Sequence, residues 1–160
     1  MKREADLANR YGLEIRAAAA SDAAGLAELL GQTGEAITPQ AIADRLDRMR
    51  DMQGAALLAV EWGPPSGIVV LHWYQGLTGA RPSALITTLY VAHEARRRGI
   101  GRLLVKAASQ AARVAGCDTL GVANAAEGRE LAAFCGATGF TQAGALLARS
   151  LRKKGDADAS

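Results

Sequence analysis

The sequence has few cysteines and lacks long apolar runs. Its 160 residues include two cysteines, Cys117 and Cys135, which are too few for a disulfide framework and exclude the class of small disulfide-rich domains. No segment reaches the ~20 apolar residues that a membrane span requires, and no apolar run of signal-peptide length follows residues 1–4. We therefore expect a cytoplasmic protein with reduced cysteines and no membrane partner.

The net charge is also low. A formal charge of +3 is too small to indicate a nucleic-acid partner. The apolar share of 49% and the charged share of 22% are those of an ordinary globular domain, and a chain of this length can bury a core of its own. We expect a single domain over residues 1–151 and a disordered, solvated C-terminal tail over residues 152–160.

Hydrophobic periodicity predicts strands that alternate with helices. A period near two, bounded by turn residues, predicts strands at residues 13–16, 55–62, 68–74, 84–91, 118–123 and 145–151. A period near 3.6, with capping residues, predicts helices at residues 23–31, 39–50, 102–115 and 127–134. One mixed sheet covered by helices follows from this order.

A turn rich in arginine and glycine joins the strand at 84–91 to the long helix that follows. Residues 96–101 read Arg-Arg-Arg-Gly-Ile-Gly. The start of a helix carries free backbone N–H groups and positive dipole charge, glycine lets an anion approach the backbone, and arginine binds phosphate through its forked donors. Leu104 stands where a dinucleotide fingerprint needs its third glycine, and no P-loop run exists. The turn therefore predicts a phosphate site of another kind.

Several motifs in this order resemble one family. Residues 96–101 fit an Arg-x-x-Gly-x-Gly signature and follow a Leu-x-Val strand end at 89–91. Asn124 follows a later strand, residues 131–140 are similar to a closing Ala-x-x-Phe-Tyr-x-x-x-Gly-Phe motif, and Ile15-Arg16-Ala17 opens the pattern. From about Leu13 to Leu151, the chain resembles the GNAT superfamily of acyl-CoA-dependent N-acetyltransferases.

The resemblance implies a fold and an activity. The fold is an α/β (α+β) domain with a mixed, mostly antiparallel sheet of about six to seven strands, flanked by about four helices. The activity is transfer of an acetyl group from acetyl-CoA to a primary amine, on a small molecule, by direct attack in a ternary complex and without a metal. A non-catalytic acyl-CoA sensor and a peptide or protein N-acetyltransferase are the alternatives. A homodimer is a further expectation from the family.

The resemblance also implies cofactor-binding residues. Backbone amides of residues 96–101 bind the coenzyme A pyrophosphate, backbone groups of residues 89–91 pair with the pantetheine arm, and the Val91 amide stabilises the oxyanion. Asn124 contacts the pantetheine arm, and Phe134 packs near it or belongs to the core. Arg98 is the arginine that we favour for phosphate contact. The full set is Leu89, Tyr90, Val91, Arg96, Arg97, Arg98, Gly99, Ile100, Gly101, Arg102, Asn124 and Phe134.

The sequence departs from the family at both proton-transfer positions. Residues 85–89 contain no Asp or Glu, and Cys135 stands where the family has a tyrosine. Cys135 is either a proton donor or a small buried hydrophobe. Other candidate bases are Glu35, Glu61, His72, His93 and Glu94. We assign no catalytic acid or base from sequence, and we expect the loops at 32–39 and 76–83 to form the acceptor pocket.

Overall fold

The computed structural model describes residues 12–79, 81–123, 129–144 and 147–152. Its five strands are β1 (Glu14–Ala17), β2 (Gly54–Val60), β3 (Gly67–Tyr74), β4 (Ser83–Val91) and β5 (Thr119–Val122). Its α-helices are α2 (Ala23–Gly31), α3 (Pro39–Met49), α4 (Ile100–Val114) and α5 (Arg129–Ala137). Two short 3-10 helices, η1 (Ala20–Asp22) and η2 (His93–Ala95), precede α2 and the Arg–Gly turn. None of the helices in the described part of the chain is both long and apolar enough to cross a membrane.

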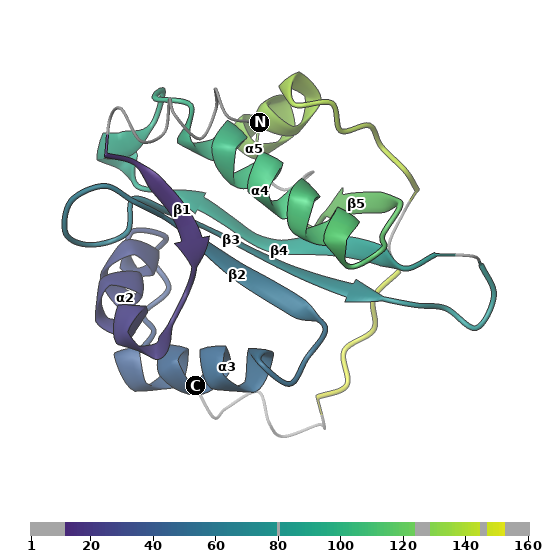
Figure 1. The fold of residues 1–160 in the computed structure, drawn as a ribbon, viewed down its shortest axis with the longest axis horizontal. Helices are drawn as coiled ribbons and strands as arrows, with labels where there is room; N and C mark the ends of the chain where they lie inside the picture. Colours follow the sequence, from purple (N-terminus) through teal and green to yellow (C-terminus); the bar gives the residue numbers. More distant parts are fainter. Residues whose placement is uncertain (1–11, 80, 124–128, 145–146, 153–160) are drawn as a thin grey trace.

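The strands form one sheet in the order β1-β2-β3-β4-β5 (Figure 1). The first four strands pair antiparallel, and β5 pairs parallel with β4. Val70 pairs with Thr88 but Leu71 pairs with Ile86, so Thr87 is an extra residue in β4, a β-bulge. Only residues 83–86 of β4 pair with β5. Among the described strands, the second half of β4 is therefore paired with β3 alone, and we call its other side the open edge.

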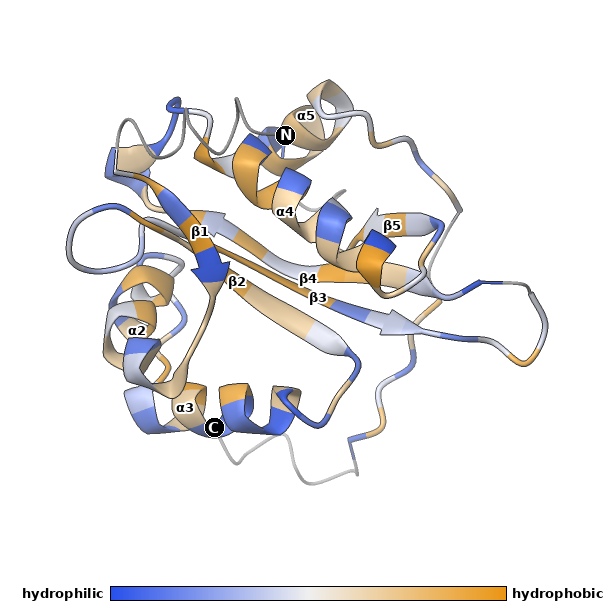
Figure 2. Ribbon diagram, in the orientation of Figure 1, coloured by the Kyte–Doolittle hydropathy of each residue, from blue (hydrophilic) through white to orange (hydrophobic). Residues whose placement is uncertain are grey.

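Helices cover both faces of the sheet. Successive side chains of β3 point to opposite faces, so β3 has apolar side chains that pack against helices on each face. A Cβ atom at Gly67 would lie 2.9 Å from Leu104 Cδ1 and 3.2 Å from Ile100 Cγ2, so this face of β3 lies against α4. The intervening Ile68 and Val70 line a cavity with residues of α2 and α3. The apolar side of α3 faces the strands (Figure 2), and α4 buries Ile100, Leu104 and Ala108. The largest fully buried side chains are Leu26, Leu58, Leu71, Ile86, Ile100, Leu104 and Val69.

A side-chain cap begins α3, whereas Asp22, which precedes α2, forms no capping hydrogen bond to that helix. Arg16 on β1 donates two hydrogen bonds to the Asp22 carboxylate, at 2.7 and 2.8 Å, and Asp22 also accepts from the Ala19 N–H at 2.8 Å. The hydrogen bond from Arg16 lowers the pKa of Asp22. Thr38 Oγ1 accepts from the Ala41 N–H at 3.1 Å, with Pro39 as the first residue of α3.

The predicted last strand is wrong for the residues that can be compared. Residues 147–151 form no strand, and the side chains of Leu147 and Leu151 are 95% and 91% exposed. Residues 147–151 pair with no strand of the described sheet, and a strand needs such a partner to satisfy its backbone groups. Within the described residues, the sheet consequently has five strands rather than six to seven. Residues 145–146 and most of the predicted tail, 153–160, lie outside the described residues.

Helix α5 also ends later than predicted. It runs through Gly136 to Ala137, where the sequence predicts a turn. The termination occurs at Gly139, whose φ of 93° is left-handed. The Phe140 N–H then donates to the Cys135 carbonyl at 2.9 Å and closes the last turn. The helix therefore continues until a glycine adopts the left-handed conformation, and Gly136 remains helical.

Candidate active site

Two cavities lie against the second half of β4. The first, which we call the β4 cleft, has a volume of about 640 Å³ and is bounded by β4, the Arg–Gly turn and α5. It is lined by Leu89, Tyr90, Val91, Ala95, Arg96, Arg97, Gly99, Ile100, Gly101, Arg102, Glu130, Leu131 and Phe134. The second, the α2–α3 cavity, has a volume of about 410 Å³. It is lined by Leu26, Leu30, Ile37, Ile42, Arg45, Leu46, Arg48, Met49, Met52, Ile68, Val70, His72, Thr87 and Thr88.

The open edge of β4 presents backbone groups to the β4 cleft. The Ala92 N–H donates to the Ser66 carbonyl at 2.8 Å, just beyond the β3–β4 ladder. Hydrogen bonding alternates along an antiparallel pair, so the N–H groups of Leu89 and Val91 point away from β3. β5 ends at Val122, whose partner is Ile86, so no described strand pairs with β4 at this level. Two strand amides therefore face a cleft in place of a neighbouring strand.

The Arg–Gly turn brings further backbone amides to the same cleft. Gly99 precedes α4 with a φ of 79°, and the Leu103 N–H donates to the Gly99 carbonyl at 3.1 Å. By helix geometry, the N–H groups of residues 100–102 have no acceptor within the helix. A Cβ atom at Gly99 would meet no heavy atom within 4 Å. Gly99 is thus required for its backbone conformation, and the space above it is open.

Strain and close packing mark two other positions of this turn. Arg97 has a φ of 64°, a left-handed conformation that costs a non-glycine residue ~1–2 kcal/mol. Gly101 is helical, and a Cβ atom there would lie 3.1 Å from the Phe134 ring. The missing side chain of Gly101 allows α5 to pack against the first turn of α4. Phe134 consequently lines the β4 cleft and supports α4 at the same time.

The arginines of the turn have different surroundings. Arg96 donates from Nε to the Val91 carbonyl at 3.2 Å and from Nη1 to Glu130 at 3.2 Å, and its guanidinium lies 5.6 Å from the centre of the Tyr90 ring. Arg98 forms a bidentate ion pair with Glu61 and does not line the cleft. Arg97 and Arg102 do line it. Within the described ranges, neither of these two is within 4 Å of a carboxylate.

The structure separates the candidate proton-transfer residues. His72 lines the α2–α3 cavity, whereas Glu61 is paired with Arg98. His93 and Glu94 lie in η2, where the His93 backbone N–H donates to Gln32 Oε1 at 3.1 Å. Glu35 is exposed on the loop after α2. Of these five predicted candidates, His72 alone lines either cavity.

Cys135 does not line either cavity. Its side chain is buried, with 5% of the residue exposed, and this burial raises the pKa of the thiol. These surroundings are those of a small core hydrophobe. Asn124, predicted to contact the pantetheine arm, lies outside the described residues. Within the described chain, no three His, Cys, Asp or Glu side chains cluster as metal ligands would.

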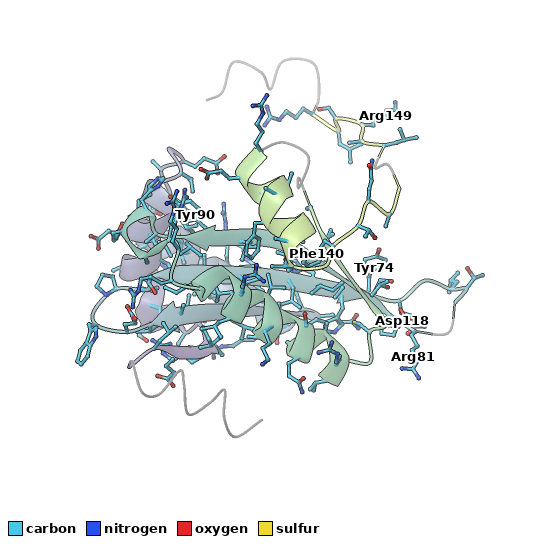
Figure 3. All side chains as sticks on the ribbon, turned by 90° about the horizontal axis from the view of Figure 1, so that it is seen from above. Tyr74, Arg81, Tyr90, Asp118, Phe140 and Arg149 are labelled. Atoms are coloured by element: carbon cyan, nitrogen blue, oxygen red, sulfur yellow. The ribbon has the colours of Figure 1, made fainter. Side chains whose placement is uncertain are left out.

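The described residues of the loop at 76–83, which is predicted to help form the acceptor pocket, lie apart from both cavities. None of them lines the β4 cleft or the α2–α3 cavity. Tyr74, just before the loop, and Arg81, within it, lie at the end of the sheet opposite Tyr90 (Figure 3). From the loop at 32–39, Ile37 lines the α2–α3 cavity. The first helix pair therefore bounds this cavity, and the long β3–β4 loop does not.

Sequence reasoning missed five cavity residues that carry polar or charged groups. Arg45 and Arg48 come from α3, Thr87 and Thr88 from β4, and Glu130 from α5. Arg45 follows Ile42 by three residues and precedes Met49 by four, so its place in the apolar stripe was a readable signal. A bulge at Thr87 depends on strand pairing and has no comparable local signal.

Comparisons with known proteins agree with this architecture. The model of the acetyltransferase (GNAT) family matches residues 24–140. A solved acetyltransferase of Trypanosoma brucei is similar, with a TM-score of 0.74, 22% identity and coverage of 87% of this chain and 99% of that chain. A glucosamine-6-phosphate N-acetyltransferase of Arabidopsis thaliana has a TM-score of 0.74, 17% identity and coverage of 88% and 99%. An aminoglycoside N-acetyltransferase in complex with coenzyme A has a TM-score of 0.75, 16% identity and coverage of 88% and 95%. The search of curated proteins gives no match.

Proposed function

The chain belongs to the GNAT acetyltransferase family, and we propose that it transfers an acetyl group from acetyl-CoA to a primary amine of a small molecule. The observation that carries the proposal is the arrangement around β4. The β4 cleft and the α2–α3 cavity both contain residues of this strand, at Leu89–Val91 and at Thr87–Thr88 respectively. A donor in the cleft and an amine in the cavity would therefore approach each other across one strand.

The residues of the β4 cleft fit coenzyme A. Its pyrophosphate suits the free amides at the start of α4 together with Arg97 and Arg102. The open space above Gly99 leaves room for phosphate oxygens close to the backbone. The outward N–H groups of Leu89 and Val91 suit an extended, amide-containing arm that pairs like an added strand. When bound, acetyl-CoA supplies the activated acyl group.

The chain's own residues supply positioning and charge stabilisation. The Val91 N–H donates to the acyl oxygen as it gains negative charge. The α2–α3 cavity holds the amine against β4, and proximity of this kind provides a large part of the rate enhancement in two-substrate reactions. We assign His72, on β3, as the acceptor of the amine proton through bound water, because its strand partner is Leu85 and that of Val91 is Gly67, five residues away on β3. No residue is assigned as proton donor to the leaving thiolate.

A thiol-release assay with acetyl-CoA and a broad panel of amines tests this proposal. The wild type should release coenzyme A with at least one amine. His72→Gln should lower kcat by about a hundredfold or more. His93→Gln is the matched control because His93 lines neither cavity, and it should stay within a few-fold of the wild type. Normal kcat in His72→Gln would contradict the assigned role.

The second candidate function is a non-catalytic acyl-CoA sensor. Two observations favour it: residues 85–89 carry no carboxylate, and Cys135 is buried where the family has a tyrosine. The same assay separates the two functions. Coenzyme A binding with no thiol release for any amine would support the sensor and overturn the transferase.

A further inference from the structure

The α2–α3 cavity has positive charge at its rim and no carboxylate among its lining residues. Arg45 and Arg48, both on α3, are exposed and line it. Across the part of the chain that the structure describes, neither guanidinium is within 4 Å of a carboxylate. Two arginines without acidic partners beside one cavity are available to bind an anion.

The amphipathic pattern of α3 determines where this charge lies. Arg45 is three residues from Ile42 and four from Met49, so it belongs to the face of the helix that lines the cavity. Asp47 falls on the opposite side of the helix from Arg45 by the same periodicity. Asp44, four residues before Arg48, accepts a hydrogen bond from Gln40 at 2.9 Å and forms no ion pair with Arg48 within 4 Å. The hydropathy colouring shows the apolar side of α3 toward the strands and the polar side away from them (Figure 2).

The walls of the cavity are aliphatic. Most lining side chains are Leu, Ile, Val or Met, contributed by α2, α3 and β3. A volume of about 410 Å³ is that of a site for a small molecule. A ligand that fills this space therefore needs an apolar body to replace the water that it displaces.

The polar side chains that line the cavity come partly from the sheet and partly from helix α3. Thr87, Thr88 and His72 come from the strands, and Arg45 and Arg48 come from α3. A ligand that spans the cavity would place an uncharged amine near β4 and an anion near α3. A polycationic amine would instead meet the two arginines, and like charges brought together in this way oppose binding.

We propose that the acceptor is a small primary amine with an apolar body and an anionic group, a carboxylate or a phosphonate, that binds Arg45 and Arg48. This inference rests on the proposed acetyltransferase function and specifies its substrate class. It makes polyamines and aminoglycosides poor acceptors for this chain.

The experiment compares matched acceptors in wild type and in the double variant Arg45→Gln/Arg48→Gln. The acceptors are L-leucine, its phosphonate analogue, uncharged L-leucinamide and the polycation spermidine. Amine basicity differs between these compounds, so the readout is the ratio of kcat/KM for each anion to that for leucinamide. The double variant should lower at least one anion's ratio by about tenfold or more. Comparison of the ratio for L-leucine with the ratio for its phosphonate analogue shows which of the two anionic groups the arginines bind.

The control is Arg50→Gln/Arg113→Gln, which removes the same charge from exposed positions that line neither cavity. It should leave the ratios within about twofold. An unchanged ratio for both anions in Arg45→Gln/Arg48→Gln, or faster turnover of spermidine than of any anion, would overturn the inference.

Calorimetry of each acceptor in the presence of coenzyme A separates this inference from the proposed function. Binding of an anion that depends on Arg45 and Arg48, without thiol release, would support anion recognition in the α2–α3 cavity and overturn the transferase. Turnover of leucinamide or spermidine alone would support the transferase and overturn the substrate class. Neither binding nor turnover of any acceptor would overturn both.

Discussion

At the scale of single residues, the glycines of the Arg–Gly turn serve different physical needs. Gly99 is required because its φ is 79°, although its surroundings would accept a Cβ atom. Gly101 has ordinary helical geometry, yet its Cβ atom would lie 3.1 Å from Phe134. A sequence pattern assigns both glycines to close anion contact. Only the backbone angles and the packing of α5 separate their roles.

The Gly99→Ala variant tests the backbone requirement. We expect the free energy of unfolding to fall by ~1–2 kcal/mol because alanine is strained in the left-handed region. Urea denaturation measures the change. Gly31→Ala is the matched control, since Gly31 is exposed in α2 and also has nothing within 4 Å of an added Cβ. Its stability should stay equal or rise slightly. Equal stability changes in both variants would contradict the explanation.

Cys135 illustrates a position where burial decides between two chemical roles. Its thiol has a raised pKa and lines neither cavity. We expect Cys135→Ala to keep kcat within a few-fold of the wild type in the thiol-release assay, with a modest loss of stability. A fall of about a hundredfold in kcat, the low end for a lost general acid, would restore the catalytic role.

Arg98 shows the limit of local sequence reasoning at this scale. The sequence places it beside Gly99, and we favour it there for phosphate contact. In the structure it pairs instead with Glu61, 37 residues earlier in the chain. Pairing of this kind depends on how β2 lies beside the turn, and no short motif encodes that position. Arg97 and Arg102 are the arginines that reach the cleft without a carboxylate partner in the described chain.

At the scale of elements, helix starts were predictable and sheet edges were less so. The capping residue Thr38 and the proline after it begin α3 as predicted, because capping is a local interaction. The strand predicted at 145–151 fails in its described part because a strand requires a partner that local alternation does not specify. The bulge at Thr87 is likewise a property of the β3–β4 pair.

The contact between Arg16 and Asp22 predicts a pH dependence for the β1–α2 connection. The pKa of Asp22 is lowered in the folded state. Its contribution to stability is therefore present above the unfolded pKa of about 3.9 and is lost as pH falls through the folded value. At pH 7, Asp22→Asn should lower the free energy of unfolding by ~1–2 kcal/mol, a range reduced for the 36% exposure of Arg16.

Urea denaturation between pH 3 and pH 7 measures this dependence. The stability difference between wild type and Asp22→Asn should shrink as the pH is lowered below about 4. Asp47→Asn, which removes an exposed carboxylate of α3, is the control and should change stability little at pH 7. A constant difference between wild type and Asp22→Asn across the whole pH range would contradict the role of the ionised carboxylate.

At the scale of the whole molecule, β4 separates the two cavities on which the proposed function rests. Helix α4 covers one face of the sheet, and α2 with α3 covers the other. The open edge of β4 and the start of α4 form one cleft, and the helix pair forms the second cavity. The order of motifs along the chain was enough to predict the family and the cleft. The charge of the second cavity depends on α3 packing and could not be read from those motifs.

Calorimetric titration of coenzyme A into wild type, Gly99→Ala and Gly99→Glu tests the central claim most directly. Gly99→Ala introduces the backbone strain alone, and Gly99→Glu adds a carboxylate where the pyrophosphate is expected to lie. We predict binding to the wild type, weaker but measurable binding to Gly99→Ala, and an affinity lower by about a hundredfold or more in Gly99→Glu. Circular dichroism confirms that each variant is folded. Equal affinity in a folded Gly99→Glu variant would contradict the assignment of the β4 cleft to coenzyme A.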